Sequence, residues 1–367
     1  MAQDQPGAEV AAATFSGVAE ASNIGFDWTF ILLCTWLTGG IFLDGWAHAH
    51  GKVDQSFFTP WHAGLYSGYL AVAIFLAVTL VRTHTKGAAW RHAYPAGYGS
   101  AIFGAAIFAV AGVGDLLWHA LFGIEKGIEG TISPSHLALA LGGTLILTGP
   151  LRAAWRHTAP DAAQRWLTLL PPLLSLTYIF SLLVLFTQFA DSIVMSRANL
   201  QVSSITLYIT GQGATLENDL STKLGVTGIL LEAAIMTGVV LVLVRRWRLP
   251  IGSFALIFGL NGLLVSFLAG NASAIGVTIL SVLIGLLIDL MNITLRPSAE
   301  RVAPWRLFAF AVPFVYNLLY FGALLLTNGS FGWSVHLWTG SIVMAGIAGL
   351  LMSYLMVPPQ MPTEAGG

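Results

Sequence analysis

Charged residues are scarce in this sequence. Asp, Glu, Lys and Arg make up only 9% of its 367 residues, whereas 56% of the residues are hydrophobic. Soluble domains carry roughly 25% charged residues, so this chain cannot cover a water-facing surface with polar groups. The net charge of −1 provides no basic surface for nucleic acid, which we exclude as a partner. The lipid bilayer is the solvent that fits this composition.

Cysteine is nearly absent, and the N-terminal segment lacks the features of a leader. The one cysteine, Cys34, lies in an apolar run, so a disulfide framework within the chain is excluded. Residues 1–27 contain no Lys or Arg and no apolar core, so we expect no cleaved signal peptide. Glycine, in contrast, is abundant, and the 40 glycines favour close packing of helices in lipid.

Ten apolar segments are long enough to cross a bilayer as helices. A span needs about twenty mostly apolar residues, because every backbone N–H and C=O must be satisfied within the helix. The sequence therefore predicts an all-α fold, a polytopic transmembrane helical bundle of about ten spans. The predicted spans are 28–48, 58–82, 97–121, 134–153, 167–190, 225–245, 250–269, 274–294, 306–327 and 333–356.

No Pro-rich or Ser-rich linker divides the apolar segments, so we expect a single transmembrane domain over residues 28–357. Its first part, 28–155, contains the duplicated hairpins described below, and residues 165–357 form the remaining bundle. The longest connection, 191–224, is predicted to be an outer loop. Residues 1–27 and 358–367 are predicted to be a cytoplasmic N-terminal segment and a cytoplasmic tail.

Basic residues are concentrated in alternate loops, which predicts the orientation of the chain. Three Lys or Arg residues fall in or beside each of four alternate loops, together 12 of the 16 in the sequence. Such loops are cytoplasmic in membrane proteins. Both termini are then cytoplasmic, and the expected location is the plasma membrane of a bacterium or archaeon. These residues are Arg82, Lys86, Arg91, Arg152, Arg156, Arg165, Arg245, Arg246, Arg248, Arg296, Arg301 and Arg306.

Four of the nine histidines belong to a pattern that occurs twice. Each copy reads Asp-x-x-x-His at the end of one span and [Ser/Thr]-Pro-x-His at the start of the next. Spans one to four are therefore predicted to be two copies of a helical hairpin, an internal repeat. The first copy is Asp44-Gly45-Trp46-Ala47-His48 with Thr59-Pro60-Trp61-His62, and the second is Asp115-Leu116-Leu117-Trp118-His119 with Ser133-Pro134-Ser135-His136.

The spacing within the pattern brings side chains together. Residues four apart lie on one face of a helix, so each Asp faces the same point as its His. Proline is tolerated in the first helical turn, and Ser or Thr before it is a suitable N-cap. The end of one helix and the start of the next are neighbours in a hairpin. One carboxylate and two imidazoles are therefore expected to converge in each hairpin, near the outer side of the membrane.

A carboxylate with two imidazoles is a suitable ligand set for a transition metal. Imidazole binds Cu, Zn, Fe and Ni, and three such ligands leave coordination positions open for a small ligand. A carboxylate within a membrane is costly and usually marks function. The alternative is that these groups only cap helices or form hydrogen bonds at the interface. The predicted metal ligands are Asp115, His119, His136, Asp44, His48 and His62; we expect one ion, bound mainly by the first three.

The second copy of the pattern resembles a known signature. Asp115-x-x-Trp118-His119 with Ser133-Pro134-Ser135-His136 is similar to the metal-binding motif of the C subunit of copper membrane monooxygenases, the particulate methane and ammonia monooxygenases. The resemblance implies that Asp115, His119 and His136 hold copper in the membrane. It also implies a copper-dependent monooxygenase, dioxygen or a small apolar molecule as substrate, and partner membrane subunits with a periplasmic copper domain.

Other functions and neighbouring residues follow from the same sequence. The leading hypothesis is a copper-dependent oxidoreductase, or a subunit of one. The alternatives are a membrane protein for copper or zinc transport or storage, a haem b membrane subunit, and a structural subunit with a degenerate site. Zinc, iron and haem b are the alternative cofactors.

No individual catalytic residue is predicted. The residues expected to contact the metal ligands, rather than the metal itself, are Glu232, Glu125, Glu129 and His336.

Overall fold

The computed structural model describes residues 22–52, 57–123, 128–157, 166–188, 212–270, 274–329 and 332–359. It confirms the all-α membrane bundle: within these residues, nine helices are long and apolar enough to cross a membrane. The nine are α1 (Ile24–Ala49), α2 (Pro60–Thr85), α3 (Gly99–Phe122), α5 (Pro134–His157), α6 (Trp166–Phe186), α9 (Gln212–Arg246), α11 (Ala274–Leu295), α12 (Val302–Asn328) and α13 (Val335–Met356).

The predicted span 250–269 is a shorter helix than expected. Helix α10 (Ser253–Ala269) has 17 residues, about 26 Å of helix against a hydrocarbon core of about 30 Å. Its start is fixed by Gly252, whose φ of +91° lies in the left-handed region. The carboxylate of Asp289 in α11 accepts hydrogen bonds from three backbone N–H groups within residues 252–255. A neighbouring helix thus satisfies donors that the start of α10 would leave unpaired.

The predicted outer loop 191–224 ends earlier than expected. Helix α9 already begins at Gln212, so residues 212–224 are helical rather than part of a loop. The predicted span 225–245 covered only the apolar part of this helix. Water can satisfy a helix that continues beyond the hydrocarbon core, so polar sequence need not end it. Residues 189–211 of the predicted loop lie outside the described residues.

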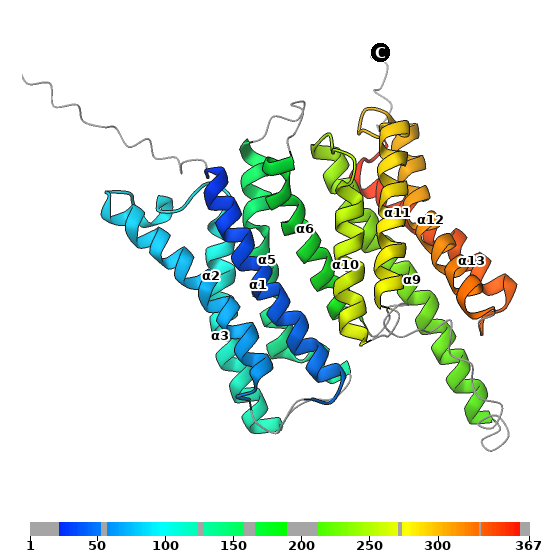
Figure 1. The fold of residues 1–367 in the computed structure, drawn as a ribbon, viewed down its shortest axis with the longest axis horizontal. Helices are drawn as coiled ribbons and strands as arrows, with labels where there is room; N and C mark the ends of the chain where they lie inside the picture. Colours follow the sequence, from blue (N-terminus) through cyan, green and yellow to red (C-terminus); the bar gives the residue numbers. More distant parts are fainter. Residues whose placement is uncertain are drawn as a thin grey trace, which may run out of the picture.

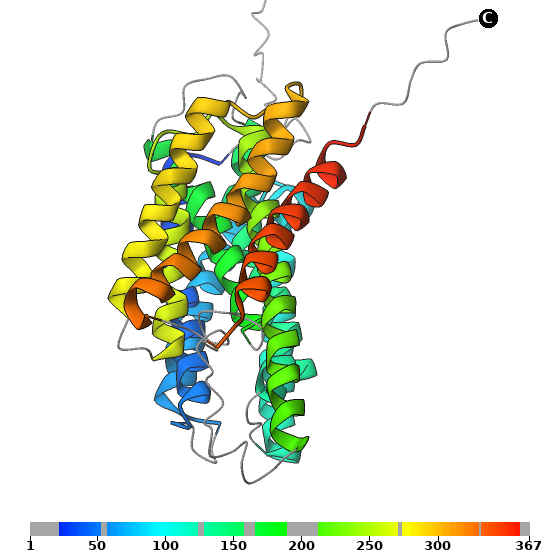
Figure 2. The ribbon, with the colours of Figure 1, turned by 90° about the vertical axis from the view of Figure 1, so that its right-hand side faces the viewer.

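The helices form two groups joined by a central pair. Helices α1, α2, α3 and α5 lie on one side of Figure 1, α9, α12 and α13 on the other, with α6 and α10 between them. Helix α6 packs against α5, α1, α10 and α9, and therefore contacts both groups. The start of α1 and the end of α13 lie at the same, upper end of the bundle in Figure 1, and Figure 2 shows the end of α13 there from the side.

An equivalent glycine contact brings the helices together in each of the two hairpins, α1–α2 and α3–α5. A Cβ atom on Gly68 of α2 would lie 2.8 Å from the backbone nitrogen of Leu37 in α1, and one on Gly142 of α5 would lie 2.8 Å from that of Phe108 in α3. Each glycine follows the histidine of its [Ser/Thr]-Pro-x-His motif by six residues. Each contacted residue precedes the aspartate of its hairpin by seven. The repeat therefore extends to backbone packing, which fixes the register in which Asp and His meet.

Replacing Gly142 by alanine should destabilise the protein, because the added methyl would overlap the backbone of α3. Overpacking of this kind costs about 1–3 kcal/mol. Gly114→Ala is the matched control, since a Cβ atom there meets nothing within 4 Å and alanine is favoured over glycine within a helix. In thermal unfolding of the purified protein in detergent, Gly142→Ala should melt earlier than wild type and Gly114→Ala should not. Equal melting of both variants would contradict the close helix contact.

Candidate metal centre

The six predicted ligands come together at one end of the bundle. All of them lie on the four helices of the repeat, where α1 and α3 end and α2 and α5 begin, at the lower end of that group in Figure 1. Asp44 and His48 belong to α1, His62 to α2, Asp115 and His119 to α3, and His136 to α5.

The start of each second helix is capped as the sequence predicts. The Thr59 hydroxyl accepts a hydrogen bond from the backbone N–H of His62, at 3.2 Å. The Ser133 hydroxyl accepts one from the backbone N–H of His136, at 3.4 Å. Both histidines therefore stand in the first turn of their helices, and their rings turn towards the end of the preceding helix.

Each carboxylate faces two imidazole nitrogens of its own hairpin. The separations are too long for good hydrogen bonds, which run at about 2.7–3.2 Å. None of the four pairs forms a hydrogen bond. They are Asp44 Oδ2 to His48 Nε2 at 3.8 Å, Asp44 Oδ1 to His62 Nε2 at 3.5 Å, Asp115 Oδ1 to His119 Nε2 at 3.5 Å and Asp115 Oδ1 to His136 Nε2 at 3.4 Å.

The two hairpins share one cluster rather than forming separate sites. The ring centroid of His48 lies 6.0 Å from that of His62, 6.4 Å from that of His119 and 6.0 Å from that of His136. Two groups have ligand atoms that all lie within 4.8 Å of one another: Asp44, His48 and His62, and His62, Asp115 and His119. His62 belongs to both groups. The second group therefore takes a histidine from the other hairpin, which the sequence did not predict.

Both carboxylates are buried without a compensating cation. Asp44 is 7% exposed and Asp115 is 1% exposed. Among the described residues, neither forms an ion pair with Lys or Arg, and each has an Oδ1 atom that accepts no hydrogen bond. An isolated buried carboxylate is strongly unfavourable unless it is paired or binds a metal. The cluster therefore has the charge and the donor set for a cation.

The other ring nitrogens of three histidines have partners that orient the rings. His62 Nδ1 donates to the carbonyl oxygen of Phe57, and His119 Nδ1 donates to that of Gly123 at 3.3 Å. A carbonyl oxygen only accepts, so Nδ1 carries a proton in these two rings, and in a neutral ring Nε2 then presents its lone pair to the cluster. His136 Nδ1 lies 2.9 Å from the Ser133 hydroxyl. Metal-binding histidines are commonly held in this way.

Two aromatic residues of the cluster were not predicted from the sequence. The hydroxyl of Tyr66 in α2 points its donor at Asp115 Oδ2 in a long hydrogen bond of 3.5 Å. The ring of Phe57 stacks on His62 with centroids 4.6 Å apart. Tyr66 follows His62 by four residues and so shares its helix face. That spacing was the signal that could have identified it.

The structure does not bring Glu232 or His336 to the cluster. Glu232 is buried in α9, which packs against α13, α12 and α6, and His336 is exposed on α13. Figure 1 shows both helices beyond α6 and α10 from the four helices of the centre. Glu125 lies outside the described residues, and only the backbone of Glu129 is described, in α4 (Ile128–Ile132).

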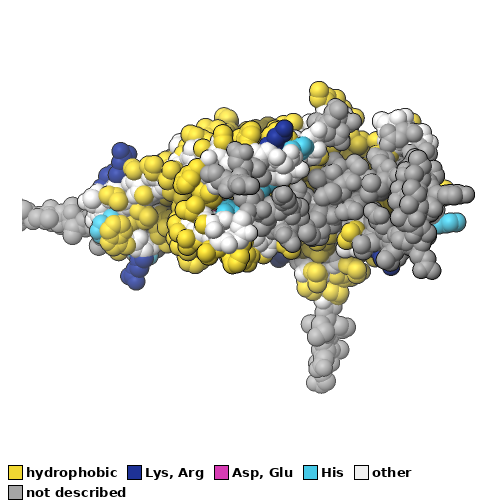
Figure 3. All heavy atoms as spheres, turned by 90° about the horizontal axis from the view of Figure 1, so that it is seen from below, with side chains coloured by type: hydrophobic (Ala, Val, Ile, Leu, Met, Phe, Trp, Pro, Cys, Tyr) yellow, Lys and Arg dark blue, Asp and Glu magenta, His cyan; other side chains and the backbone are white. Residues whose placement is uncertain are grey.

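Among the residues that Figure 3 colours by type, no acidic side chain is visible from the end of the bundle that holds the cluster. Figure 3 gives this view, and among the residues coloured by type it shows apolar side chains with scattered His, Lys and Arg. This agrees with the burial of Asp44 and Asp115. The carboxylates thus belong to the interior of the centre.

Comparisons with known proteins give no relative: no family model, no curated protein and no solved structure matches this chain. What the centre does must therefore be argued from its own geometry.

Replacing His62 should weaken binding of a transition-metal ion more than replacing either His48 or His136, because only His62 belongs to both groups. We expect the dissociation constant for Cu²⁺ to rise in His62→Ala by more than the roughly 10–100-fold that loss of an outer partner costs. The measurement is a titration of purified metal-free protein. His50→Ala is the control, since the His50 Nδ1 atom bonds to the Trp46 carbonyl oxygen. Equal losses for His62, His48 and His136 would contradict the sharing of His62.

Proposed function

We propose that the cluster binds a transition-metal ion and that this ion is copper. The observation that carries this proposal is the spacing of the donor atoms. An ion with nitrogen and oxygen ligands at about 2.0–2.2 Å and tetrahedral angles would hold those ligands about 3.4 Å apart. Three of the Asp–His pairs are separated by 3.4–3.5 Å. The pairs are thus spaced for an ion between them rather than for direct hydrogen bonds.

The charge of the cluster supports one divalent ion. Two carboxylates with four neutral imidazoles carry two negative charges, which one divalent ion would neutralise. A second divalent ion would need a further anionic ligand such as hydroxide. Because His62 belongs to both donor groups, we propose a single ion shared by the hairpins. Its principal ligands are Asp115, His119 and the shared His62, with Asp44 and His48 completing the site and His136 neighbouring it.

Copper is favoured over the other metals that these ligands accept. The donors are nitrogen and oxygen without thiolate, and Cu²⁺ stands at the peak of affinity among divalent first-row ions for such sites. The resemblance of residues 115–136 to the copper-binding motif of membrane monooxygenases supports the same choice. Haem b fits less well, because Asp44 and Asp115 lie within 4 Å of the Nε2 atoms and occupy the space that a porphyrin plane would need.

The activity that we propose is that of an oxidoreductase, similar to a monooxygenase, or of a subunit of one. Bound copper would supply one-electron redox chemistry. The protein supplies the ligands, the second-layer contacts that orient them, and an apolar surrounding through which a small apolar substrate or dioxygen can approach. Partner membrane subunits with a periplasmic copper domain would complete such an enzyme.

Transport or storage of copper or zinc finds less support. An ion that crosses the bundle would need polar side chains beside the centre. Instead, Phe42 of α1, Leu185 of α6 and Leu268 of α10 form an apolar cluster within two residues of Asp44 along α1. Glu232 is a buried carboxylate that a relay through the membrane could use, but it belongs to α9, which lies beyond α6 and α10. The side chains of α1, α6 and α10 nearest to Asp44 are therefore apolar, and buried polar side chains lie farther along these helices, at Thr38, Ser181 and Asn261.

The centre is proposed to face the outside of the cell. It lies at the end of the bundle opposite the ends of α2, α5 and α9, which carry Arg82, Arg152 and Arg245. Basic ends of membrane helices are cytoplasmic. The start of α1 and the end of α13 then also lie on the cytoplasmic side, in the plasma membrane of a bacterium or archaeon.

Metal analysis with a visible spectrum tests the proposal. Purified protein should contain copper and show no Soret band. Asp115→Asn and His119→Ala should each lose most of the metal while still inserting into the membrane, because a buried ligand that loses its partner costs the site several kcal/mol, on the order of 3–5 kcal/mol. His84→Ala is the control, since His84 stacks on Trp90 near the end of α2 remote from the centre. A Soret band would replace copper by haem, and unchanged occupancy in both ligand variants would place the metal elsewhere.

A further inference from the structure

Three buried oxygen atoms in the middle of the bundle have no hydrogen-bond partner among the described residues. They are the hydroxyls of Thr38 in α1 and Ser181 in α6 and the side-chain carbonyl oxygen of Asn261 in α10. Thr38 is 3% exposed, Ser181 0% and Asn261 8%. A buried polar group without a hydrogen bond is unfavourable, above all within a membrane. The three atoms therefore need a partner that the described side chains and backbone do not supply.

The two hydroxyls do not use the partner that a helix offers to Ser and Thr. Such side chains can bond to a carbonyl of their own helix one turn earlier. Thr35 of α1 and Thr177 of α6 do so, at 2.8 Å and 2.7 Å. Thr38 and Ser181 form no such bond. Their hydroxyls therefore remain available for a ligand between the helices.

Contacts on either side of the two hydroxyls place them at the same level of α1 and α6. Thr35 Oγ1 lies 2.8 Å from Tyr178 Oη, and Phe42 and Leu185 belong to one apolar cluster. On each helix the second residue follows the first by seven, so α1 and α6 run in the same direction with a fixed register. Each unpartnered hydroxyl lies three residues after the first contact and four before the second. It therefore shares the helix face that carries the apolar contact.

Asn261 reaches this level from α10. It precedes Leu268 by seven residues and so lies on the same face of the helix. Leu268 packs in the apolar cluster with Leu185, and the rings of Phe180 and Phe258 lie 6.1 Å apart. These two contacts between α6 and α10 lie on either side of the α6 hydroxyl and of Asn261. The three unpartnered oxygens thus converge where α1, α6 and α10 meet.

The chemistry of the three atoms favours water over an ion. A hydroxyl donates and accepts, whereas an amide carbonyl only accepts, and water can match both. Helices α6 and α10 contain no acidic residue, and the two in α1, Asp27 and Asp44, lie six or more residues from Thr38. A cation would therefore have no counter-charge from these helices at this level. Water needs none.

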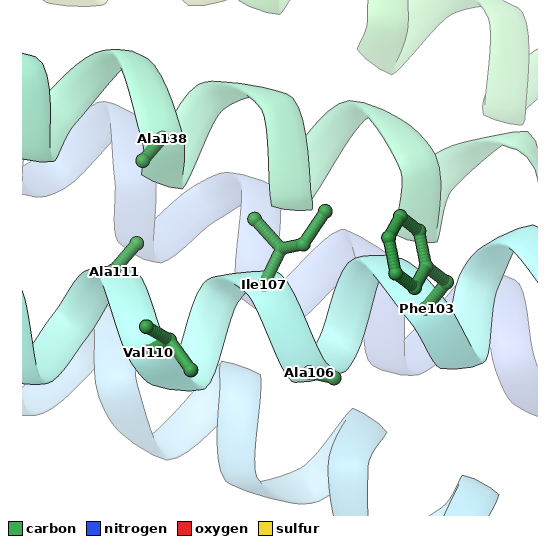
Figure 4. Close-up of a pocket in the computed structure, with 6 residues that line it drawn as sticks. All are labelled: Phe103, Ala106, Ile107, Val110, Ala111 and Ala138. Atoms are coloured by element: carbon green, nitrogen blue, oxygen red, sulfur yellow. The ribbon is translucent and has the colours of Figure 1, made fainter.

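An apolar hollow on α3 and α5 has no comparable need for a polar ligand. Figure 4 shows its lining side chains, which include Phe103, Val110 and Ala138 and are all apolar. Phe103 and Val110 are exposed, and lipid chains are as apolar as such a surface. The oxygens of Thr38 and Ser181 are instead enclosed by protein, so a small polar molecule is the ligand that fits them.

We propose that Thr38, Ser181 and Asn261 bind ordered water inside the membrane and so join α1 to α6 and α10. Buried waters typically make about three hydrogen bonds to groups without protein partners. The water would connect the four-helix repeat with the central pair of helices in Figure 1. The site is separate from the metal centre, because the apolar Phe42 lies between Thr38 and Asp44 along α1.

X-ray radiolysis of the purified protein in ¹⁸O-labelled water tests for this water. Hydroxyl radicals that form from water held inside a protein oxidise the side chains beside it. Tyr178 is only 4% exposed and lies one turn from Ser181 on α6, so it should gain ¹⁸O in wild type. The double variant Thr38→Val/Ser181→Ala should reduce this product severalfold. Thr177→Val is the control and should leave it unchanged, because the Thr177 hydroxyl bonds within its own helix.

Oxidation of Tyr354, which is exposed on α13, shows that radicals have formed. If Tyr354 is oxidised and Tyr178 is not, no water lies at the junction and the proposal is overturned. Equal oxidation of Tyr178 in wild type and in the double variant would overturn it as well, because the water would then not be held by Thr38 and Ser181.

Melting temperatures of the single and double variants test whether the side chains share the water. Valine keeps the shape of threonine without its hydroxyl, so Thr38→Val should lower the melting temperature because the bound water loses a partner. The decrease should be smaller in protein that already carries Ser181→Ala, in which the shared water is weakened. In a dry junction Thr38→Val would raise the melting temperature, because an unpaired buried hydroxyl is removed. A rise, no change, or an equal decrease in both backgrounds would overturn the shared water site.

Discussion

Asp44 and Asp115 bring two carboxylates into the interior of a membrane bundle, and the arrangement around them reflects the need to compensate their charge. Both are nearly inaccessible, and no Lys or Arg among the described residues pairs with them. Four imidazoles lie nearest to them. In two of these Nδ1–H donates a hydrogen bond to a backbone carbonyl, so that in the neutral ring Nε2 faces the carboxylates as an acceptor. Lone pairs from both kinds of side chain then meet at one place, which is unfavourable without a cation and favourable with one.

The repeat explains how these groups come to the same depth. Gly68 and Gly142 let the second helix of each hairpin approach the first at equivalent positions, seven residues before the aspartate. The hairpins thus present the same ligand set at the same end, and their packing joins the two sets through His62.

Local features of the centre could be predicted from the sequence, and contacts between hairpins could not. The Asp-x-x-x-His spacing and the caps at Thr59 and Ser133 depend on helix geometry alone, so they were predictable. That His62 joins Asp115 and His119 depends on how α2 and α3 pack, which no short-range pattern encodes. Glu232 was misplaced for the same reason, because its apolar surroundings fit any position in the bundle. The length of α10 depends on Asp289, a cap supplied from another helix.

X-ray absorption at the copper edge of the copper-loaded protein tests the central claim most directly. The account predicts one copper per chain with nitrogen and oxygen ligands at about 2.0 Å and outer-shell scattering from two or more imidazoles. It also predicts the loss of one imidazole contribution in His119→Ala loaded with excess copper. Copper without imidazole scattering, or a spectrum unchanged in that variant, would contradict the assignment of the Asp–His cluster as a metal centre.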